Sequence, residues 1–172
     1  MLLGQYLPTV EVCQIYHTFD QQKPRKGLSE KLIRRKLEKS GWTVWRGGLL
    51  NITDQMELYP NVRKKYDALL TLLRKYRPGA IDELRYLCQV HHGMPDFLCY
   101  RNGQFKFIEC KLGYESLSKA QKLCVSRLQC LGFPVEVHRL AEPQTLIRAA
   151  VVNLRNGKKR IRIKQRSLKE RL

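Results

Sequence analysis

The sequence predicts an α/β fold in which a mixed sheet is flanked by helices. The predicted element order is α-β-β-β-α-β, with a helical insertion between the first and second strands. Two segments, residues 28–40 and 117–131, repeat apolar residues at the spacing of an amphipathic helix. Short runs between them are rich in the β-branched and aromatic residues that strands prefer. Two of these runs are separated by Asn102-Gly103, a strong β-hairpin signal.

The first helix is predicted over residues 28–40, because its apolar residues lie on one face and Gly41 ends the pattern. These apolar residues are Leu28, Leu32, Ile33 and Leu37. The first strand follows at residues 42–46 and is closed by Gly47-Gly48. No structure is predicted for the N-terminal segment, residues 1–26.

The insertion is predicted at about residues 60–90. Apolar residues repeat at helical spacing over residues 61–77 and again over 81–89, and Pro78-Gly79 separates the two helices. The hairpin strands are then predicted at residues 96–100 and 104–112.

The C-terminal part of the predicted core is a helix at residues 117–131 and a strand at 134–140. Residues 143–154 are predicted to form a last helix. The tail beyond it is strongly basic, although Ile161 and Ile163 alternate with basic residues as in a strand. One domain is therefore expected at residues 27–142, followed by a C-terminal helix and basic tail at 143–172.

The chain carries a large positive charge. Its 172 residues include 33 Lys and Arg but 15 Asp and Glu, a formal net charge of +18. Basic surface binds polyanions by releasing the counterions condensed on phosphates, so nucleic acid is the expected partner. An acidic membrane surface and a ribosome-like structural role are the alternatives. No apolar run is long enough to cross a bilayer, and we expect a cytoplasmic protein, with a homodimer as an open possibility.

The hairpin brings charged side chains together. If Asn102-Gly103 is a two-residue turn, antiparallel pairing places Asp96 opposite Glu109, with Cβ atoms about 4.5 to 5.5 Å apart. Lys111 lies on the same face, two residues beyond Glu109. Two facing carboxylates repel each other unless a cation or Lys111 offsets their charge. Mg²⁺ prefers such oxygen ligands and keeps water for phosphodiester hydrolysis, which makes this a candidate metal site.

The alternative for these residues is a solvated ladder of charges on an exposed strand. Phe105 and Phe107 precede Glu109 on the same face, however, so the charges continue an apolar stripe that is expected to be buried. Buried charges require partners, which favours the metal site.

These residues lie in motifs that resemble the core of PD-(D/E)XK nucleases, with most similarity to VRR-NUC domains. The motifs are Gly93-Met94-Pro95-Asp96, Ile108-Glu109-Cys110-Lys111 and Leu117-Ser118-Lys119-Ala120-Gln121. Archaeal Holliday-junction resolvases look similar in the same segments. The resemblance covers roughly residues 27–140 and implies a restriction-endonuclease-like core, apart from the insertion.

The resemblance also implies roles for residues outside the hairpin. Glu30 would complete a site for Mg²⁺, or Mn²⁺ as its substitute, with Asp96 and Glu109, and Cys110 would offer its backbone carbonyl. The alternative for Glu30 is a solvated residue that favours the helix dipole. Gln121 would lie near the catalytic centre with Lys111, but it also fits a capping box with Ser118, and the residues do not decide between these roles.

Several basic residues are candidates for contacts with a nucleic-acid backbone. One group surrounds Glu30 in the sequence and includes Arg34 and Arg35, and another lies in the tail and includes Lys158, Lys159 and Arg160. Arg46, beside Trp42 and Trp45, is either a contact at the mouth of the site or a solvated residue whose neighbouring Trp is buried.

The remaining candidates are weaker. Cys88, His91, His92 and Cys99 include metal-binding residue types, but they lack the paired spacing of a zinc site. The six cysteines show no CxxC spacing and are expected to be mostly reduced core residues.

The resemblance and the predicted metal site together indicate a metal-dependent nuclease that cleaves DNA, with structured or branched DNA in repair or recombination as the expected substrate. The alternative from another class is a non-catalytic nucleic-acid-binding protein. Within the superfamily, a Holliday-junction resolvase is the alternative.

Overall fold

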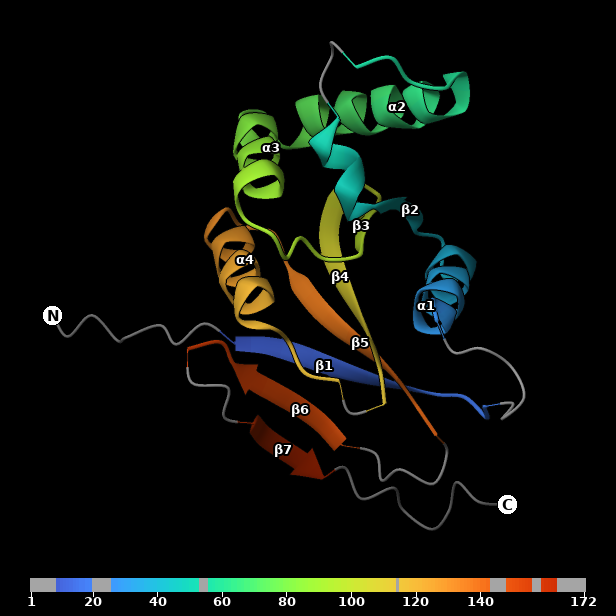
Figure 1. Ribbon diagram of the computed structural model, residues 1–172, viewed down its shortest axis with the longest axis vertical. Helices are drawn as coiled ribbons and strands as arrows, with labels where there is room; N and C mark the ends of the chain where they lie inside the picture. The colour runs from blue at the N-terminus through green and yellow to red at the C-terminus, as the bar shows by residue number, and fades with distance from the viewer. Residues whose placement is uncertain are drawn as a thin grey trace, which may run out of the picture.

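The computed structural model describes residues 9–19, 26–52, 56–113, 115–142, 148–155 and 159–163, and these form an α/β fold (Figure 1). The helices are α1 (Leu28–Lys39), α2 (Pro60–Tyr76), α3 (Ala80–Val90) and α4 (Lys119–Cys130), with a short 3-10 helix η1 (Gly47–Asn51). The strands are β1 (Thr9–Tyr16), β2 (Thr43–Arg46), β3 (Phe97–Arg101), β4 (Gln104–Leu112), β5 (Val135–Ala141), β6 (Arg148–Asn153) and β7 (Lys159–Ile163). The predicted order α-β-β-β-α-β is present as α1, β2, β3, β4, α4 and β5, with α2 and α3 inserted after β2.

All seven strands belong to one mixed sheet, in the order β2-β3-β4-β5-β1-β6-β7. The pairs β2–β3 and β3–β4 are antiparallel, because each connection joins two strand ends at the same edge of the sheet. β5 lies parallel to β4, because α4 carries the chain back across the sheet between them. The mixed sheet predicted from the sequence is therefore confirmed.

The β3–β4 hairpin has the predicted two-residue turn. Asn102 and Gly103 both have positive φ angles, 50° and 81°, as a type I′ turn requires. The strand pairs run from Arg101 with Gln104 to Phe97 with Ile108, which is the predicted register. Glu109 is the next residue of β4, whereas Asp96, predicted to begin the strand, lies in a bend directly before β3.

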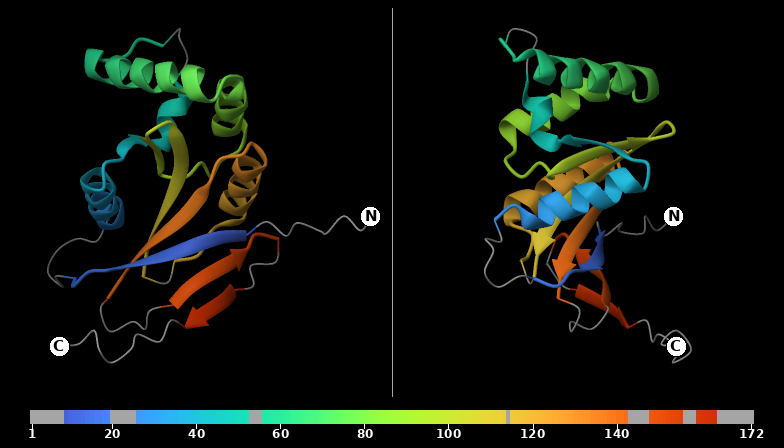
Figure 2. Two further views of the ribbon diagram at one scale, coloured as in Figure 1. Left: turned by 180° about the vertical axis from the view of Figure 1, so that it is seen from behind. Right: turned by 90° about the vertical axis from the view of Figure 1, so that its right-hand side faces the viewer.

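Alternation along β4 divides the core between the two faces of the sheet. Phe105 and Phe107 point to the face covered by α4 and pack with a cluster that includes Cys124 and Leu128. Ile108 and Cys110 point to the opposite face, where α1 contributes Ile33 and Leu37. Figure 2 shows the two helices with the sheet between them.

The N-terminal segment, for which the sequence predicts no structure, supplies a strand inside the sheet. β1 lies between β5, to which it is parallel, and β6, to which it is antiparallel. Val10 and Val12 point into the core on the α4 face. The sheet therefore extends beyond the predicted domain of residues 27–142.

The helix predicted over residues 143–154 is wrong, because residues 148–153 form β6. Val152 pairs with Val10 of β1 and is buried, so long-range pairing has prevailed over local helical spacing. β7 pairs with β6, and the alternation of Ile161 and Ile163 thus belongs to a strand of the fold. The rest of the predicted tail, residues 156–158 and 164–172, lies outside the described residues.

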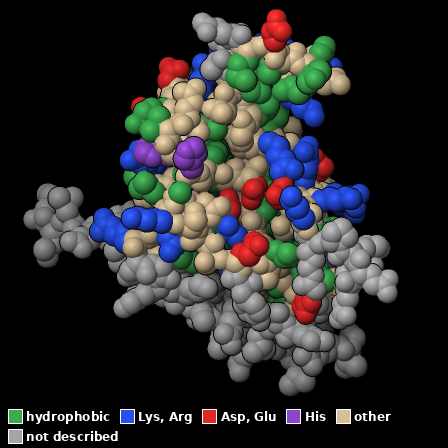
Figure 3. Space-filling view, in the orientation of Figure 1, with side chains coloured by type: hydrophobic (Ala, Val, Ile, Leu, Met, Phe, Trp, Pro, Cys, Tyr) green, Lys and Arg blue, Asp and Glu red, His purple; other side chains and the backbone are tan. Residues whose placement is uncertain are grey.

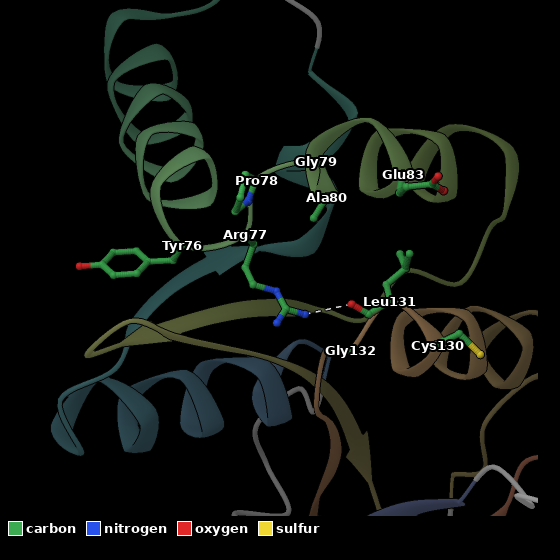
Figure 4. A pocket seen from close by; sticks show the side chains of 9 residues that line it. All are labelled: Tyr76, Arg77, Pro78, Gly79, Ala80, Glu83, Cys130, Leu131 and Gly132. Atoms are coloured by element: carbon green, nitrogen blue, oxygen red, sulfur yellow. Dashed lines mark hydrogen bonds between the residues drawn. The ribbon is translucent and has the colours of Figure 1, made fainter.

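The helical insertion packs at one end of the α4 face (Figure 1). Leu69 and Leu73 of α2 and Leu84 and Leu87 of α3 join the same core cluster as Phe107. Arg77, at the turn between the two helices, donates a hydrogen bond to the carbonyl of Leu131 at 2.9 Å (Figure 4). Both residues line a hollow of about 550 Å³. Even α2, at 17 residues the longest described helix, does not qualify as a membrane span, and neither does any other described helix.

We predict that Gly103→Ala lowers the free energy of unfolding by about 1 to 2 kcal/mol, because a Cβ atom is disfavoured at positive φ. Urea denaturation followed by circular dichroism measures the loss. The control is Gly48→Ala, since Gly48 lacks a positive φ and a Cβ there would meet nothing within 4 Å. The control should change by less than about 0.5 kcal/mol. Equal losses in the two variants would contradict the role of the turn.

Candidate active site

The predicted site residues line one cavity of about 430 Å³. It lies where the C-terminal end of β4, the start of β3 and the first turns of α1 and α4 meet. Its lining residues are Lys26, Gly27, Ser29, Glu30, Asp96, Glu109, Cys110, Lys111, Leu112, Glu115 and Gln121. The five side chains predicted to be catalytic, Glu30, Asp96, Glu109, Lys111 and Gln121, are thus brought together.

Asp96 is held by backbone groups on two sides. The N–H of Gly47 donates to its carbonyl at 2.8 Å, and the N–H of Cys110 donates to its Oδ2 at 2.8 Å. Burial raises the pKa of Asp96 and the charge of Glu30 raises it further, while the hydrogen bond from Cys110 acts in the opposite direction. This hydrogen bond engages Oδ2 and not Oδ1.

Glu109 is almost completely buried, with 3% of its surface exposed. Its Oε1 accepts hydrogen bonds from Lys111 Nζ at 2.9 Å and from Gln121 Nε2 at 2.5 Å. Burial and the nearby charge of Asp96 raise the pKa of Glu109 to about 7, against the opposing effect of Lys111. The carboxylate therefore holds a proton easily in the absence of a further cation.

Gln121 forms the capping box and also contacts Glu109 and Lys111, while its part in catalysis stays a prediction. Its side chain accepts from the N–H of Ser118 while its own N–H donates to Ser118 Oγ, which completes a capping box at the start of α4. The same side chain bonds Glu109 and accepts from Lys111 Nζ at 3.0 Å. The helix cap thus orients the two charged groups on β4.

Glu30 lies in the first turn of α1, at the edge of the cavity, and forms an ion pair with Arg46. The Arg46 side chain is 61% exposed and lies over the Phe97 ring, 5.6 Å from its centroid. The ion pair brings Arg46 to Glu30 at the edge of the cavity, and its solvated side chain is what the alternative describes, while its contact with DNA stays a prediction. Trp45, its neighbour, is buried in the core.

Two close backbone approaches fix the loop that carries Asp96. A Cβ atom at Gly47 would lie 2.0 Å from the carbonyl oxygen of Pro95. At Gly93, which has a φ of 122°, a Cβ atom would lie 2.7 Å from the Gln121 backbone nitrogen. Only glycine fits these positions, so the loop is packed against both η1 and the start of α4.

The donor atoms of this cavity fit a hard divalent cation. Glu30, Asp96 and Glu109 offer carboxylate oxygens, which Mg²⁺ and Mn²⁺ bind together with retained water. Burial, and to a smaller extent a neighbouring carboxylate, raises the pKa of Asp96 and of Glu109, and a bound cation would oppose both effects. The Cys110 thiol packs into the cluster on the α1 face, so only its backbone can serve the cavity.

The three carboxylates are not gathered as tightly as a complete ligand set. Among the described residues, one group of three possible ligands has all its donor atoms within 4.8 Å of one another, and it is Cys13, Glu136 and His138. A Mg²⁺ ion needs only one or two carboxylates beside water, so the wider spacing is compatible with the site.

Glu115 is a cavity residue that the sequence patterns do not predict. Its Oε2 accepts from the N–H of Leu112 at 2.9 Å, and its backbone carbonyl accepts from Arg139 at 2.9 Å. It lies in the loop between β4 and α4, where no periodicity reports which side chains turn inward. The feature of the sequence that could have indicated this position is that Glu115 lies between the Glu109-x-Lys111 motif and the Ser118 cap.

The weaker zinc candidate is not assembled. Cys99 is buried on the α1 face, whereas Cys88 packs against the core on the α4 face. One ring nitrogen of His91 lies 2.5 Å from Arg127. All six cysteines are free, and Cys13 and Cys130 are exposed rather than in the core.

The predicted nucleic-acid contacts have different environments. Arg34 is engaged by Glu38 at 2.8 Å and by the Val44 carbonyl at 3.4 Å, whereas Arg35 is exposed. Lys159 and Arg160 lie in β7, and Lys158 lies outside the described residues. Figure 3 shows acidic side chains gathered at the middle of the face that bears the cavity, with Lys and Arg side chains on either side.

Comparison of the sequence with protein-family models and with curated proteins gives no match. The assignment of this cavity therefore rests on its residues and their geometry.

We predict that Glu109 makes stability fall as the pH rises from about 4.5 to 7. Its folded pKa of about 7 exceeds the value of 4.5 expected when unfolded, so the folded state binds the proton more tightly in this window. In chelator, wild type should lose on the order of 2 kcal/mol relative to Glu109→Gln between these pH values. Urea denaturation at a series of pH values measures the difference.

The control for this experiment is Glu57→Gln, because Glu57 is exposed. Its unfolding free energy should follow that of wild type across the same pH range. A Glu109→Gln profile parallel to wild type would contradict the buried, proton-holding carboxylate.

Proposed function

We propose that this protein is a metal-dependent nuclease that hydrolyses phosphodiester bonds in DNA. The observation that carries the proposal is the meeting of Asp96, Glu109 and Lys111 in one cavity that also contains Glu30. A buried carboxylate (Glu109) and a half-buried one (Asp96) beside a lysine suit a metal-assisted attack on phosphate, and a net charge of +18 suits a polyanionic substrate. The motif resemblance to PD-(D/E)XK nucleases supports the same chemistry and implies structured or branched DNA as substrate.

Glu30, Asp96 and Glu109 would hold Mg²⁺ or Mn²⁺, with the Cys110 carbonyl as a further oxygen ligand. The ion would supply a polarised phosphoryl oxygen and a bound water of lowered pKa. Asp96 is prepared for this role, because the Cys110 N–H fixes one of its oxygens and leaves the other available. Glu109 must release its proton to become a ligand, so activity should rise with pH near neutrality.

Lys111 supplies a fixed positive charge beside the reacting phosphate. Its Nζ is held by Glu109 at 2.9 Å and by Gln121 at 3.0 Å, and 8% of the residue is exposed. An ammonium group held in place with little water stabilises charge that develops on phosphate oxygens. Gln121 is a positioning residue, since it bonds both Lys111 and Glu109.

Arg46 links metal binding to substrate binding. In this structure its guanidinium pairs with Glu30 at the rim of the cavity. A cation held by Glu30 would weaken this pair and free the exposed guanidinium, which can form bidentate hydrogen bonds with a phosphate. The residue would then hold the DNA backbone beside the catalytic carboxylates.

The surface around α1 is suited to DNA. Exposed cations follow the helix that carries Glu30, and Figure 3 shows basic side chains beside the acidic cavity. The exposed cations of α1 are Lys31, Arg35, Lys36 and Lys39. Like charges crowded on one helix are stabilised when an anion lies across them, as a phosphate backbone would.

We predict that Asp96→Asn, Glu109→Gln and Lys111→Ala each lower the rate of Mg²⁺-dependent DNA cleavage by at least about 100-fold. Binding should change by less than about threefold, because these residues are not part of the basic surface. Cleavage of labelled flap, junction, single-stranded and duplex DNA, with binding measured in parallel, tests both statements. Glu57→Gln is the matched control and should cleave as wild type does.

If wild type binds all these DNA structures but cleaves none of them with Mg²⁺ or Mn²⁺, the protein is a non-catalytic nucleic-acid-binding protein instead. Full activity in the Asp96 or Glu109 variant would show that another site performs the chemistry.

We predict that the double variant Lys31→Ala/Arg35→Ala weakens DNA binding most at low salt. Removing one interaction with a phosphate should reduce the slope of log affinity against log salt by about 0.9 for duplex DNA. The control variant Lys64→Ala/Lys65→Ala removes the same charge from α2, and its slope should change less. Fluorescence anisotropy at several salt concentrations measures the slopes. Equal changes in both variants would indicate that total charge, rather than the α1 surface, governs binding.

A further inference from the structure

A second group of possible metal ligands lies on the opposite face of the sheet from Glu109. Cys13 of β1 and His138 of β5 are register partners, and Glu136 lies two residues before His138 on the same side of β5. The Cys13 thiol, a ring nitrogen of His138 and a carboxylate oxygen of Glu136 all lie within 4.8 Å of one another. The group therefore joins the N-terminal strand to the centre of the sheet.

The carboxylate of this group is already ionised and surrounded by donors. Lys106 Nζ lies 2.9 and 3.0 Å from its two oxygens, and His138 Nε2 lies 2.8 Å from Oε2. The hydrogen bond from His138, followed by the contact with Lys106, lowers the pKa of Glu136 to about 2. Both of its carboxylate oxygens thus lie within hydrogen-bond distance of a donor.

The histidine has an unmet hydrogen-bonding requirement. His138 is 9% exposed, and its buried Nδ1 has no hydrogen-bond partner among the described residues. Buried polar nitrogens are normally satisfied, so an unsatisfied one in a cluster of ligand residues points to the binding of a further group.

We propose that Cys13, Glu136 and His138 form a zinc site that is separate from the Asp96–Glu109 cavity. A thiolate, an imidazole and a carboxylate are the ligand types that Zn²⁺ binds, whereas Mg²⁺ avoids sulfur and nitrogen. Three protein ligands leave the fourth tetrahedral position for water. The proposal does not depend on the nuclease activity.

Zinc uptake requires two local changes. The Cys13 thiol must lose its proton, so the affinity should increase with pH. Lys106 must withdraw from Glu136, but it keeps a second partner, because its Nζ lies 4.5 Å from the centre of the Trp42 ring.

The site can be reached from solvent. Glu136, Lys106 and Trp42 line a hollow of about 470 Å³, and Cys13 on the neighbouring strand is exposed. A metal bound there would cross-link β1 to β5 and stabilise the folded sheet in proportion to its affinity.

The experiment uses Co²⁺ and Zn²⁺ with the full-length Asp96→Asn/Glu109→Gln variant, in which the other metal site is disabled. Co²⁺ should produce a thiolate-to-metal charge-transfer band in the near ultraviolet, and equimolar Zn²⁺ should abolish it. Zn²⁺ should also raise the melting temperature by several degrees. Adding Cys13→Ser should remove the charge-transfer band and weaken Co²⁺ binding at least tenfold.

The matched control is Cys130→Ser, which removes an exposed cysteine from α4 and should leave the band intact. Glu136→Gln should weaken Co²⁺ binding while keeping the thiolate band at saturating metal. Absence of the band at micromolar to millimolar Co²⁺, or its persistence in Cys13→Ser, would show that Glu136, His138 and Lys106 form an ion-pair network without a metal role.

Discussion

The register of the β3–β4 hairpin is the constraint on which the candidate active site depends. The turn at Asn102-Gly103 fixes which residues face each other, and the pleat then places Phe107, Glu109 and Lys111 on the α4 face. A slip of one residue would move Glu109 to the α1 face, among Ile33, Leu37 and Val44. The apolar stripe of β4 resists such a slip, because Phe105 and Phe107 would leave the core.

Glu109 and Lys111 are buried at the end of the apolar stripe of β4, next to the start of α4. A buried ammonium and carboxylate need hydrogen bonds on their remaining sides, and Gln121 provides them while it caps the helix. Structural and chemical requirements thus meet in one side chain. Asp96 likewise has a structural and a site contact: its carbonyl accepts a hydrogen bond from Gly47 in η1, and its carboxylate accepts one from Cys110 in β4.

Local patterns predicted the elements that build the site, and non-local pairing produced those that were missed. The hairpin, α1, α4 and the insertion each carry a period or a turn within a short window. β1 and β6 pair across more than a hundred residues, which leaves no local trace beyond composition. The helix predicted over 143–154 failed for this reason, since Val152 is buried by β1 rather than by its own neighbours.

Within the site, Glu109 and Lys111 followed from strand alternation and Asp96 from the hairpin register, although Asp96 lies in the bend before β3. The ion pair between Arg46 and Glu30 and the position of Glu115 depend on how a helix and a loop close over the sheet, which no spacing rule describes. Cys13, Glu136 and His138 were likewise invisible, because two strands far apart in the sequence bring them together.

The position of β1 between β5 and β6 affects the folding of the chain as well as the stability of the sheet. During synthesis β1 emerges before the other described strands, yet its parallel neighbour β5 ends at Ala141 and its antiparallel neighbour β6 ends at Asn153. β1 therefore stays unpaired until these two strands have been synthesised. Contacts between such distant segments slow folding and expose strands to aggregation. Folding of the sheet therefore includes a late step in which β1 pairs with β5 and β6.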